Sequence, residues 1–180
     1  MRIPVNREIE LRTVAVAEFE SVFSAVDQNR AHLREWLPWV DASKSARGYL
    51  DVIKYWQHDI DSGAGLPMGV YFKGEFIGMC GFNTIDHQSK RAQIGYWISK
   101  EFEGRGVVRK AVESLIDYGF SQLELNRIEI ICGVENKRSR KLPESLDFTE
   151  EGVMKEYEFL YDHFHDCVLY RMLKSEYDNK

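Results

Sequence analysis

The chain has 180 residues, 44% of them hydrophobic, and a formal net charge of −5 at pH 7. This length and composition predict a single domain over residues 1–180 with a core of its own. The acidic balance and the absence of a Lys/Arg cluster disfavour nucleic-acid binding. No apolar stretch is long enough for a bilayer or a secretory leader, and the three cysteines are widely spaced. We therefore expect a cytoplasmic protein with reduced thiols and no membrane partner.

Apolar periodicity divides the N-terminal half into strands and helices. Apolar residues recur at helical spacing from Tyr49 to Ile60, and two short apolar runs flank a Lys-Gly-Glu turn, the pattern of a hairpin. The elements expected here are a strand over residues 9–14, a helix over residues 18–37 that breaks near Asn29, a helix over residues 49–60 that ends near Gly63 and Gly65, and a hairpin of residues 68–72 and 76–82.

The C-terminal half continues with alternating strands and helices. Residues 91–98 alternate with period two, which is typical of a strand with one buried face. The elements expected are this strand, a helix from Val107, a strand over residues 127–134, a short helix over residues 137–146 that contains Pro143, and final strands over residues 148–160 and 165–173. Strands mixed with helices, with hairpins at both ends, predict an α/β fold with a partly parallel sheet.

A glycine-rich turn over residues 103–109 lies between the predicted strand and the helix from Val107. Backbone N–H groups at a helix start lack helical partners, and together with the helix dipole they suit an anion. Gly104 and Gly106 would let the backbone approach a phosphate where a Cβ would collide. The turn has neither the Gly-Lys-Ser/Thr of a nucleotide-triphosphate loop nor three glycines of a dinucleotide fingerprint. It predicts a diphosphate cradle, although a simple strand-to-helix junction would also explain it.

Several ordered motifs carry a family resemblance. They read Ile-Gly-Tyr-Trp-Ile at residues 94–98, Glu-Gly-Arg-Gly at 103–106, Asn-Lys-Arg-Ser at 136–139, Leu-Arg-Glu-Trp-Leu-Pro-Trp at 33–39 and His-Asp at 165–166. Over nearly its whole length the chain resembles GNAT acetyltransferases of the Rim-type branch, which acetylate ribosomal-protein N-termini, and within it the Bacillus-type ribosomal-protein serine acetyltransferases. The resemblance implies a GNAT fold, with a mixed sheet of about seven strands that is splayed at its centre and flanked by helices.

The resemblance also implies acetyl-CoA as cosubstrate and no metal. Its pantetheine arm would pair with the backbone of the strand before the turn, and its diphosphate would lie on the turn itself. The implied cofactor-binding residues are Trp97, Ile98, Ser99, Gly104, Arg105, Gly106, Val107, Val108, Arg109 and Asn136. Glu103 and Val108 depart from the usual family residues at their positions, and Arg109 is large enough to reach a phosphate.

Acetyl transfer from a thioester to an amine needs a neutral amine and a stabilised thiolate. Asn136 and Ser139 are three residues apart, so they share one side of a helical turn, although Asn136 could simply cap the helix. By resemblance, Ser139 would donate a proton to the thiolate and Asn136 would contact the cofactor arm. Glu158 matches the proposed general base, and Glu156 is expected on the same strand face. An α-amine has a pKa of about 7.7–8.0, so it is partly neutral near pH 7 and needs only a weak base.

The resemblance further implies an acceptor groove that involves Trp36, Trp39 and His165. Aromatic residues at such spacing are more often core, so we expect some of these rings to be packed inside. The segment Asp162 to Asp166 contains two histidines, but without a closed set of ligands a zinc site is disfavoured.

Three functions remain open from the sequence. The first is acetylation of a protein N-terminus, for example that of a ribosomal protein. The second is acetylation of a small amine such as a polyamine, an amino sugar or a peptide antibiotic. The third is a CoA-binding regulatory protein without turnover. The many large rings outside the cofactor half lead us to expect a homodimer or higher homo-oligomer.

Overall fold

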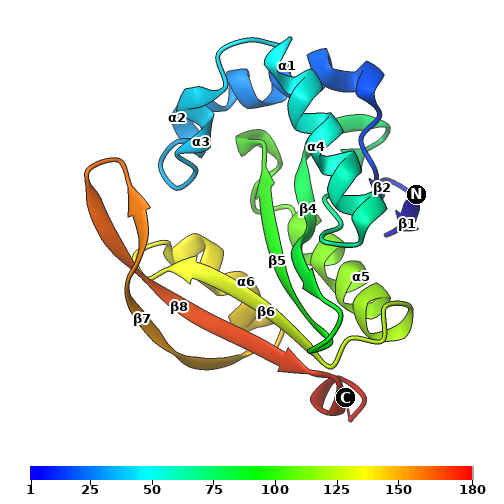
Figure 1. Ribbon diagram of the computed structural model, residues 1–180, viewed down its shortest axis with the longest axis vertical. Coiled ribbons are helices and arrows are strands. Elements are labelled where there is room, and N and C mark those ends of the chain that lie inside the picture. Colours follow the sequence, from blue (N-terminus) through cyan, green and yellow to red (C-terminus); the bar gives the residue numbers. More distant parts are fainter. Residues whose placement is uncertain (180) are drawn as a thin grey trace.

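The computed structural model describes residues 1–179 and contains one mixed sheet of eight strands (Figure 1). The strand order is β1-β2-β3-β4-β5-β6-β8-β7. The strands are β1 (Arg2–Pro4), β2 (Ile9–Arg12), β3 (Gly69–Phe72), β4 (Glu75–Asp86), β5 (Arg91–Ile98), β6 (Arg127–Gly133), β7 (Thr149–Leu160) and β8 (His163–Leu173). The mixed α/β sheet is confirmed. The sequence did not indicate β1, because a three-residue edge strand with one buried side chain shows no alternation.

Helices cover both faces of this sheet. They are η1 (Val16–Glu18), α1 (Phe19–Gln28), α2 (Arg30–Leu33), α3 (Trp39–Ala42), α4 (Gly48–Ser62), η2 (Lys100–Phe102), α5 (Val107–Ser121), α6 (Lys137–Ser145) and α7 (Lys174–Tyr177). The expected break at Asn29 is confirmed, but the helix that follows ends at Leu33, so Trp36 lies in a turn. The expected end of α4 at Gly63 is also confirmed, with a left-handed φ of 73°.

Two separate hydrophobic clusters hold the layers together. The larger one packs α5 against the sheet, and β4 contributes Ile77 and Phe82 to it. The smaller one packs α1 and α4 against the sheet, and β4 contributes Phe76 and Met79 to it. Because β4 is buried from both sides, it reads as a nearly continuous apolar run rather than as an alternating one.

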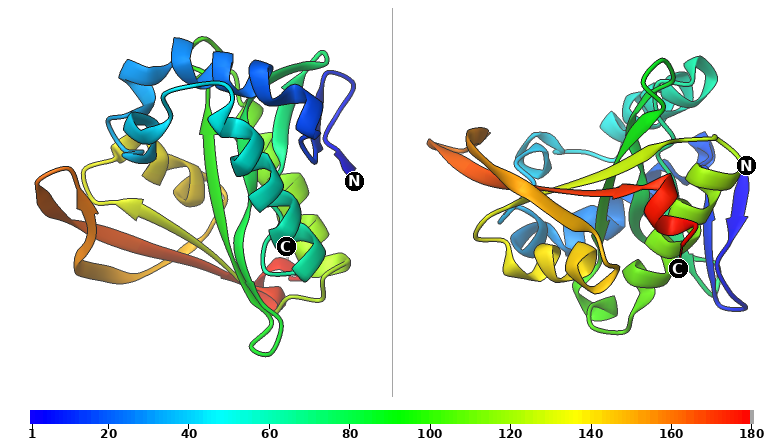
Figure 2. Two further views of the ribbon diagram at one scale, coloured as in Figure 1. Left: turned by 45° about the horizontal axis from the view of Figure 1, so that its top comes forward. Right: turned by 90° about the horizontal axis from the view of Figure 1, so that it is seen from below.

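The centre of the sheet is splayed. Strands β5 and β6 run parallel, and their pairing extends only from Arg91↔Arg127 to Ile94↔Ile130. Beyond these residues β5 remains paired with β4, and β6 remains paired with β8 as far as Gly133↔Cys167. The two strands diverge as the two arms of a V, with the α2–α3 segment across the open end (Figures 1 and 2). The expected central splay is therefore confirmed.

Strand β7 departs from simple alternation of its side chains near Glu158, the residue expected to act as the general base. Glu156 has a left-handed φ of 50°, and the register between β7 and β8 shifts between Met154 and Glu158. The N–H of Glu156 is donated to Asp166 Oδ1 at 2.9 Å. The expectation that Glu156 and Glu158 share a strand face is wrong, because this irregularity interrupts the period of two.

Candidate active site

The open end of the splay is a cavity of about 1470 Å³. It is lined by the diverging halves of β5 and β6, by the α2–α3 segment, and by the first turns of α5 and α6. Ligand pockets in proteins usually measure about 300–1,000 Å³, so this cavity has room for a large ligand beside a second one.

The glycine-rich turn forms one end of the cavity as a cradle of backbone groups. Gly104 and Gly106 have left-handed φ values of 70° and 71°, and Gly106 is the N-cap residue of the 15-residue helix α5. A Cβ built at either glycine would meet no atom within 4 Å. The space in front of the turn is therefore open, and the free N–H groups at the start of α5 suit a diphosphate.

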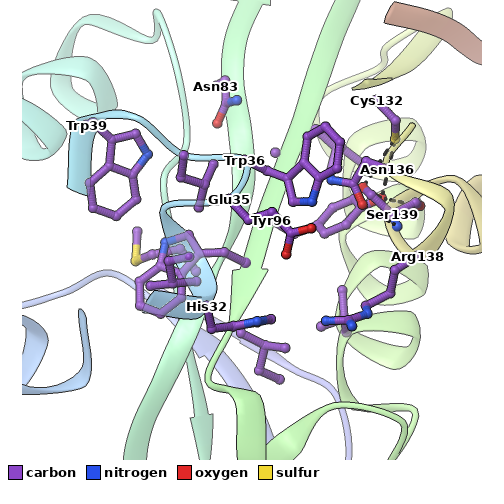
Figure 3. Close-up of a pocket in the computed structure, with 18 of the residues that line it drawn as sticks. His32, Glu35, Trp36, Trp39, Asn83, Tyr96, Cys132, Asn136, Arg138 and Ser139 are labelled. Carbon is purple, nitrogen blue, oxygen red and sulfur yellow. Dashed lines mark hydrogen bonds between the residues drawn. The ribbon is translucent and has the colours of Figure 1, made fainter. Parts of the chain in front are cut away.

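A group of charged side chains joins the two sides of the splay beside this cradle. Glu103, the first residue of the turn, accepts hydrogen bonds from Arg138 Nη1 at 2.7 and 2.9 Å. His32 Nε2 lies 3.1 Å from the same carboxylate. The side chains of His32 and Arg138 are visible on opposite sides of the cavity in Figure 3. These contacts neutralise Glu103, whose negative charge would otherwise oppose an anion in the cradle.

Strand β5 offers an unpaired edge to the cavity. Ser99 donates its N–H to Ile77 O at 2.8 Å, on the β4 side. Because successive residues of a strand point their backbone groups to opposite sides, Ile98 directs its N–H and C=O toward the splay. Trp97 packs its ring against Trp39 and Phe76, with ring centroids 6.3 and 5.9 Å apart. An extended amide-containing ligand can therefore pair with this edge.

Ser139 lies at the centre of a small hydrogen-bond network. Asn136 Oδ1 accepts the backbone N–H of Ser139 at 3.1 Å, so Asn136 is the N-cap of α6. Ser139 Oγ lies 3.0 Å from Tyr96 Oη and 3.2 Å from Cys132 Sγ (Figure 3). Burial raises the pKa of the Tyr96 phenol well above its ordinary value, and it also raises the pKa of the Cys132 thiol. All three groups are therefore protonated at neutral pH and can donate hydrogen bonds.

Glu158 lies on β7 opposite His165 of β8, and it lines the cavity. Burial raises the pKa of its carboxyl above the ordinary value, and His165 and a hydrogen bond from Cys167 partly oppose this shift. The Cys167 thiol lies 3.9 Å from Glu158 Oε2, and its own pKa is raised to about 11, mainly by burial. A half-buried carboxylate with a raised pKa is a stronger base than an ordinary glutamate.

Another part of the cavity wall is formed by the α2–α3 segment. Trp36 lies against the end of β6, where a Cβ built on Gly133 would stand 3.1 Å from its ring, and it contacts His165 edge-on at 6.3 Å between centroids. Trp39 is 40% exposed and also lines the cavity. Both rings therefore lie on the cavity wall, and neither is fully buried.

Most of the residues expected from the sequence come together at this cavity. Those on its wall are Trp36, Trp39, Trp97, Ile98, Gly104, Gly106, Val107, Val108, Arg109, Asn136, Ser139 and Glu158. Three others are not on the wall: Ser99 is buried, Arg105 lies over the Phe102 ring, and His165 packs edge-on against Trp36. Among residues 1–179, no group of three or more His, Cys, Asp or Glu side chains could hold a metal ion. No helix in that range is long and apolar enough to cross a membrane.

The sequence did not indicate two polar neighbours of Ser139. In the sequence, Tyr96 and Cys132 occupy apolar positions of alternating strands and are therefore assigned to the buried faces. This alternation gives no sign of a role for their hydroxyl and thiol groups. The pairing of Glu103 with Arg138 was also missed, since 35 residues separate the two.

Comparison with known proteins defines the family. The model of the GNAT acetyltransferase domain matches residues 8–149. YdaF of Bacillus subtilis strain 168, provisionally named a ribosomal N-acetyltransferase, is 34% identical over 177 residues, which cover 98% of this chain and 97% of that protein. The ribosomal-protein-serine acetyltransferase of Escherichia coli K12 is 30% identical over 178 residues, 97% and 98% of the two chains.

The fold of solved relatives agrees with this sequence similarity. The structure of RimL, a ribosomal L7/L12 alpha-N-protein acetyltransferase in complex with coenzyme A, superposes with a TM-score of 0.94 at 26% identity, over 98% of this chain and 99% of that one. The chain therefore belongs to the GNAT acetyltransferase family. It is an acetyl-CoA-dependent N-acetyltransferase, which transfers the acetyl group from the thioester to an amine.

Proposed function

We propose that the acceptor is the N-terminal α-amine of a protein, such as a ribosomal protein that begins with serine. The observation that carries this proposal is the similarity, over nearly the whole length of both chains, to an enzyme named for ribosomal-protein serine acetylation. The cavity supports it, because it is wide enough for a peptide end beside the cofactor. Three free thiols, at Cys80, Cys132 and Cys167, fit a protein of the cytoplasm, where ribosomal proteins are made.

The pKa of the acceptor amine favours an α-amine over a lysine side chain. Glu35 and Glu158, on the cavity wall, attract a protonated amine of either kind. An α-amine loses its proton at a pKa of about 7.7–8.0, against about 10.4 for lysine. Glu158 is the base that we assign, and its raised pKa brings it closer to that of an α-amine.

The residues of the cavity divide into those that bind the cofactor and those that transfer protons. The cradle at Gly104 and Gly106 binds the diphosphate, and the edge of β5 at Ile98 pairs with the amides of the pantetheine arm. Glu158 accepts the proton that the amine loses, while the amine nitrogen bonds to the acetyl carbon and the carbon–sulfur bond breaks. Ser139 donates a proton to the departing thiolate and regains one from solvent, and Glu158 releases the proton of the amine to solvent, so that both residues return to their starting state.

Mass spectrometry of a defined panel tests the acceptor. The protein is incubated with acetyl-CoA and four acceptors in separate reactions: a peptide with a free N-terminal serine and one internal lysine, the same peptide with its N-terminus blocked, spermidine, and an amino sugar. Modification of only the free N-terminal serine is the expected result, and fragmentation of the peptide locates the acetyl group. Faster reaction of the blocked peptide at its lysine, or of spermidine or the amino sugar, would overturn the proposal.

A further inference from the structure

A proline in α6 removes one hydrogen bond of the helix. In an α-helix the carbonyl of residue i accepts the N–H of residue i+4, so the helical donor for Ser139 O would be residue 143. Pro143 has no N–H, and its ring crowds the carbonyl four residues earlier. Because Pro143 is buried and Ser139 is partly buried, water does not freely replace the missing donor.

Tyr96 supplies a donor to this same carbonyl. The Tyr96 hydroxyl donates to Ser139 O at 3.0 Å, and the phenol oxygen Oη also lies 3.0 Å from Ser139 Oγ. A phenol carries one proton and can also accept. Since that proton is given to the carbonyl, the phenol oxygen is left as an acceptor for the Ser139 hydroxyl, which turns from the phenol to the sulfur when a thiolate forms. The raised pKa of Tyr96 keeps the proton in place.

The contact crosses the splay at a level where the strands themselves do not pair. Tyr96 belongs to β5 and lies beyond Ile94, the last residue of β5 that pairs with β6, whereas Ser139 belongs to the helix that follows β6. In Figure 3 the Tyr96 ring reaches from β5 to Ser139 at the start of α6. Asn136 holds the N–H of Ser139, and Tyr96 holds its carbonyl and hydroxyl.

We infer that Tyr96 is a positioning residue for Ser139: its hydroxyl takes the place of the helix hydrogen bond that Pro143 removes, and so fixes the first turn of α6 relative to β5. Pro143 and Tyr96 thus act together. The helix lacks one internal hydrogen bond, and a hydrogen bond from Tyr96 across the open cleft replaces it. The catalytic part of this inference rests on the proposed role of Ser139 as proton donor, but the structural part does not.

A double-mutant cycle in thermal unfolding tests the structural part. The proteins are the wild type, Tyr96→Phe, Pro143→Ala and the double variant, because an alanine in place of the proline would restore the helical N–H. Tyr96→Phe alone should lower Tm by about 2–12 °C, the range for one unpaired buried acceptor in a protein of this size. In the Pro143→Ala background it should lower Tm by less than half as much. Equal losses in the two backgrounds would overturn the inference.

Kinetics of the same variants test the positioning role. Tyr96→Phe should lower kcat about tenfold while the KM for acetyl-CoA changes less than about twofold, because small displacements of a reacting group reduce the chemical step. In the Pro143→Ala background the loss should shrink to about threefold or less. A change in KM alone would instead make Tyr96 part of the cofactor wall.

Two further variants separate this inference from the role of Ser139. In a Ser139→Ala background, Tyr96→Phe should cause no additional loss of kcat, since it acts through that hydroxyl; an undiminished loss would overturn the positioning role. If Ser139→Ala itself is fully active, the proton-donor proposal fails, and the unfolding cycle alone decides the structural part. Tyr71→Phe is the matched control, because Tyr71 is buried and bonded to Glu18 outside the cavity wall, so Tm should fall without a change in kcat.

Discussion

Substitution of Gly106 separates backbone strain from cofactor binding. A residue with a Cβ loses about 1–2 kcal/mol in the left-handed conformation that Gly106 adopts at φ 71°. Gly74, in the turn between β3 and β4, has a φ of 86°, and a Cβ there would also meet no atom within 4 Å. Gly106→Ala and Gly74→Ala should therefore each lower Tm by about 2–8 °C for a chain of this size.

The two variants should differ in their affinity for CoA. The methyl group of Gly106→Ala would stand where the diphosphate approaches the turn, and loss of one hydrogen bond to a charged group is worth about 1.5–3 kcal/mol, or about 10–150-fold in Kd. Gly106→Asp adds a negative charge, which at about 5 Å and an effective dielectric constant of about 20 costs roughly 3 kcal/mol more per phosphate charge. Gly74→Ala should bind CoA as the wild type does.

Isothermal titration with CoA measures these affinities, and circular dichroism shows whether each variant is folded. A folded Gly106→Asp protein with wild-type affinity would refute the assignment of the cradle. Equal weakening by Gly74→Ala would show that the loss reflects general destabilisation instead of a contact with the diphosphate.

Four other outcomes follow from the site. Ser139→Ala should lower kcat by about 10²-fold or more with little change in CoA affinity, and wild-type turnover would place the proton donor elsewhere. At acid pH both Glu158 and the acceptor amine must lose a proton before reaction. A plot of log kcat/KM against pH should therefore rise with slope two below the raised pKa of Glu158 and with slope one from there to the amine pKa. Glu158→Gln should show slope one throughout, and a retained slope of two would exclude Glu158 as the base. Glu103→Gln should tighten CoA binding about two- to fivefold at low salt, because the positive charge of Arg138 beside the cradle would lose its counter-charge. Weaker binding would mean that the bonds of Glu103 to Arg138 and His32 hold the turn in shape. Light scattering should find a dimer or larger assembly at micromolar concentration, and a monomer would contradict the expected homo-oligomer.

Local signals in the sequence were enough to predict most of the elements and the conformation of the glycine-rich turn. The alternation of residues 91–98 and the two glycines at 104 and 106 are properties of neighbouring residues, and each produced the expected local structure. The spacing of Asn136 and Ser139 likewise placed both in the first turn of a helix, and the cap was anticipated.

Features that depend on distant residues were not predictable in this way. The contact of Tyr96 with Ser139 joins residues 43 positions apart, and no pattern near either of them indicates it. The left-handed conformation of Glu156 accompanies its hydrogen bond to Asp166 on the neighbouring strand, so alternation along β7 alone gave the wrong face. The splay was expected from family resemblance, since the point at which β5 and β6 stop pairing depends on what packs between them.

The division of the core into two clusters has a consequence for how such an enzyme can change its substrate. The segment that carries Trp36 and Trp39 is anchored by Leu33 and Val40 in the smaller cluster, whereas the cradle is anchored by Val107 and Ala111 in the larger one. Substitutions that reshape the acceptor wall can therefore be absorbed by repacking on one face of the sheet, with the geometry of thioester binding left intact on the other. Acceptor choice and cofactor affinity become separately evolvable traits, and one scaffold can come to serve chemically different amines by a series of small steps.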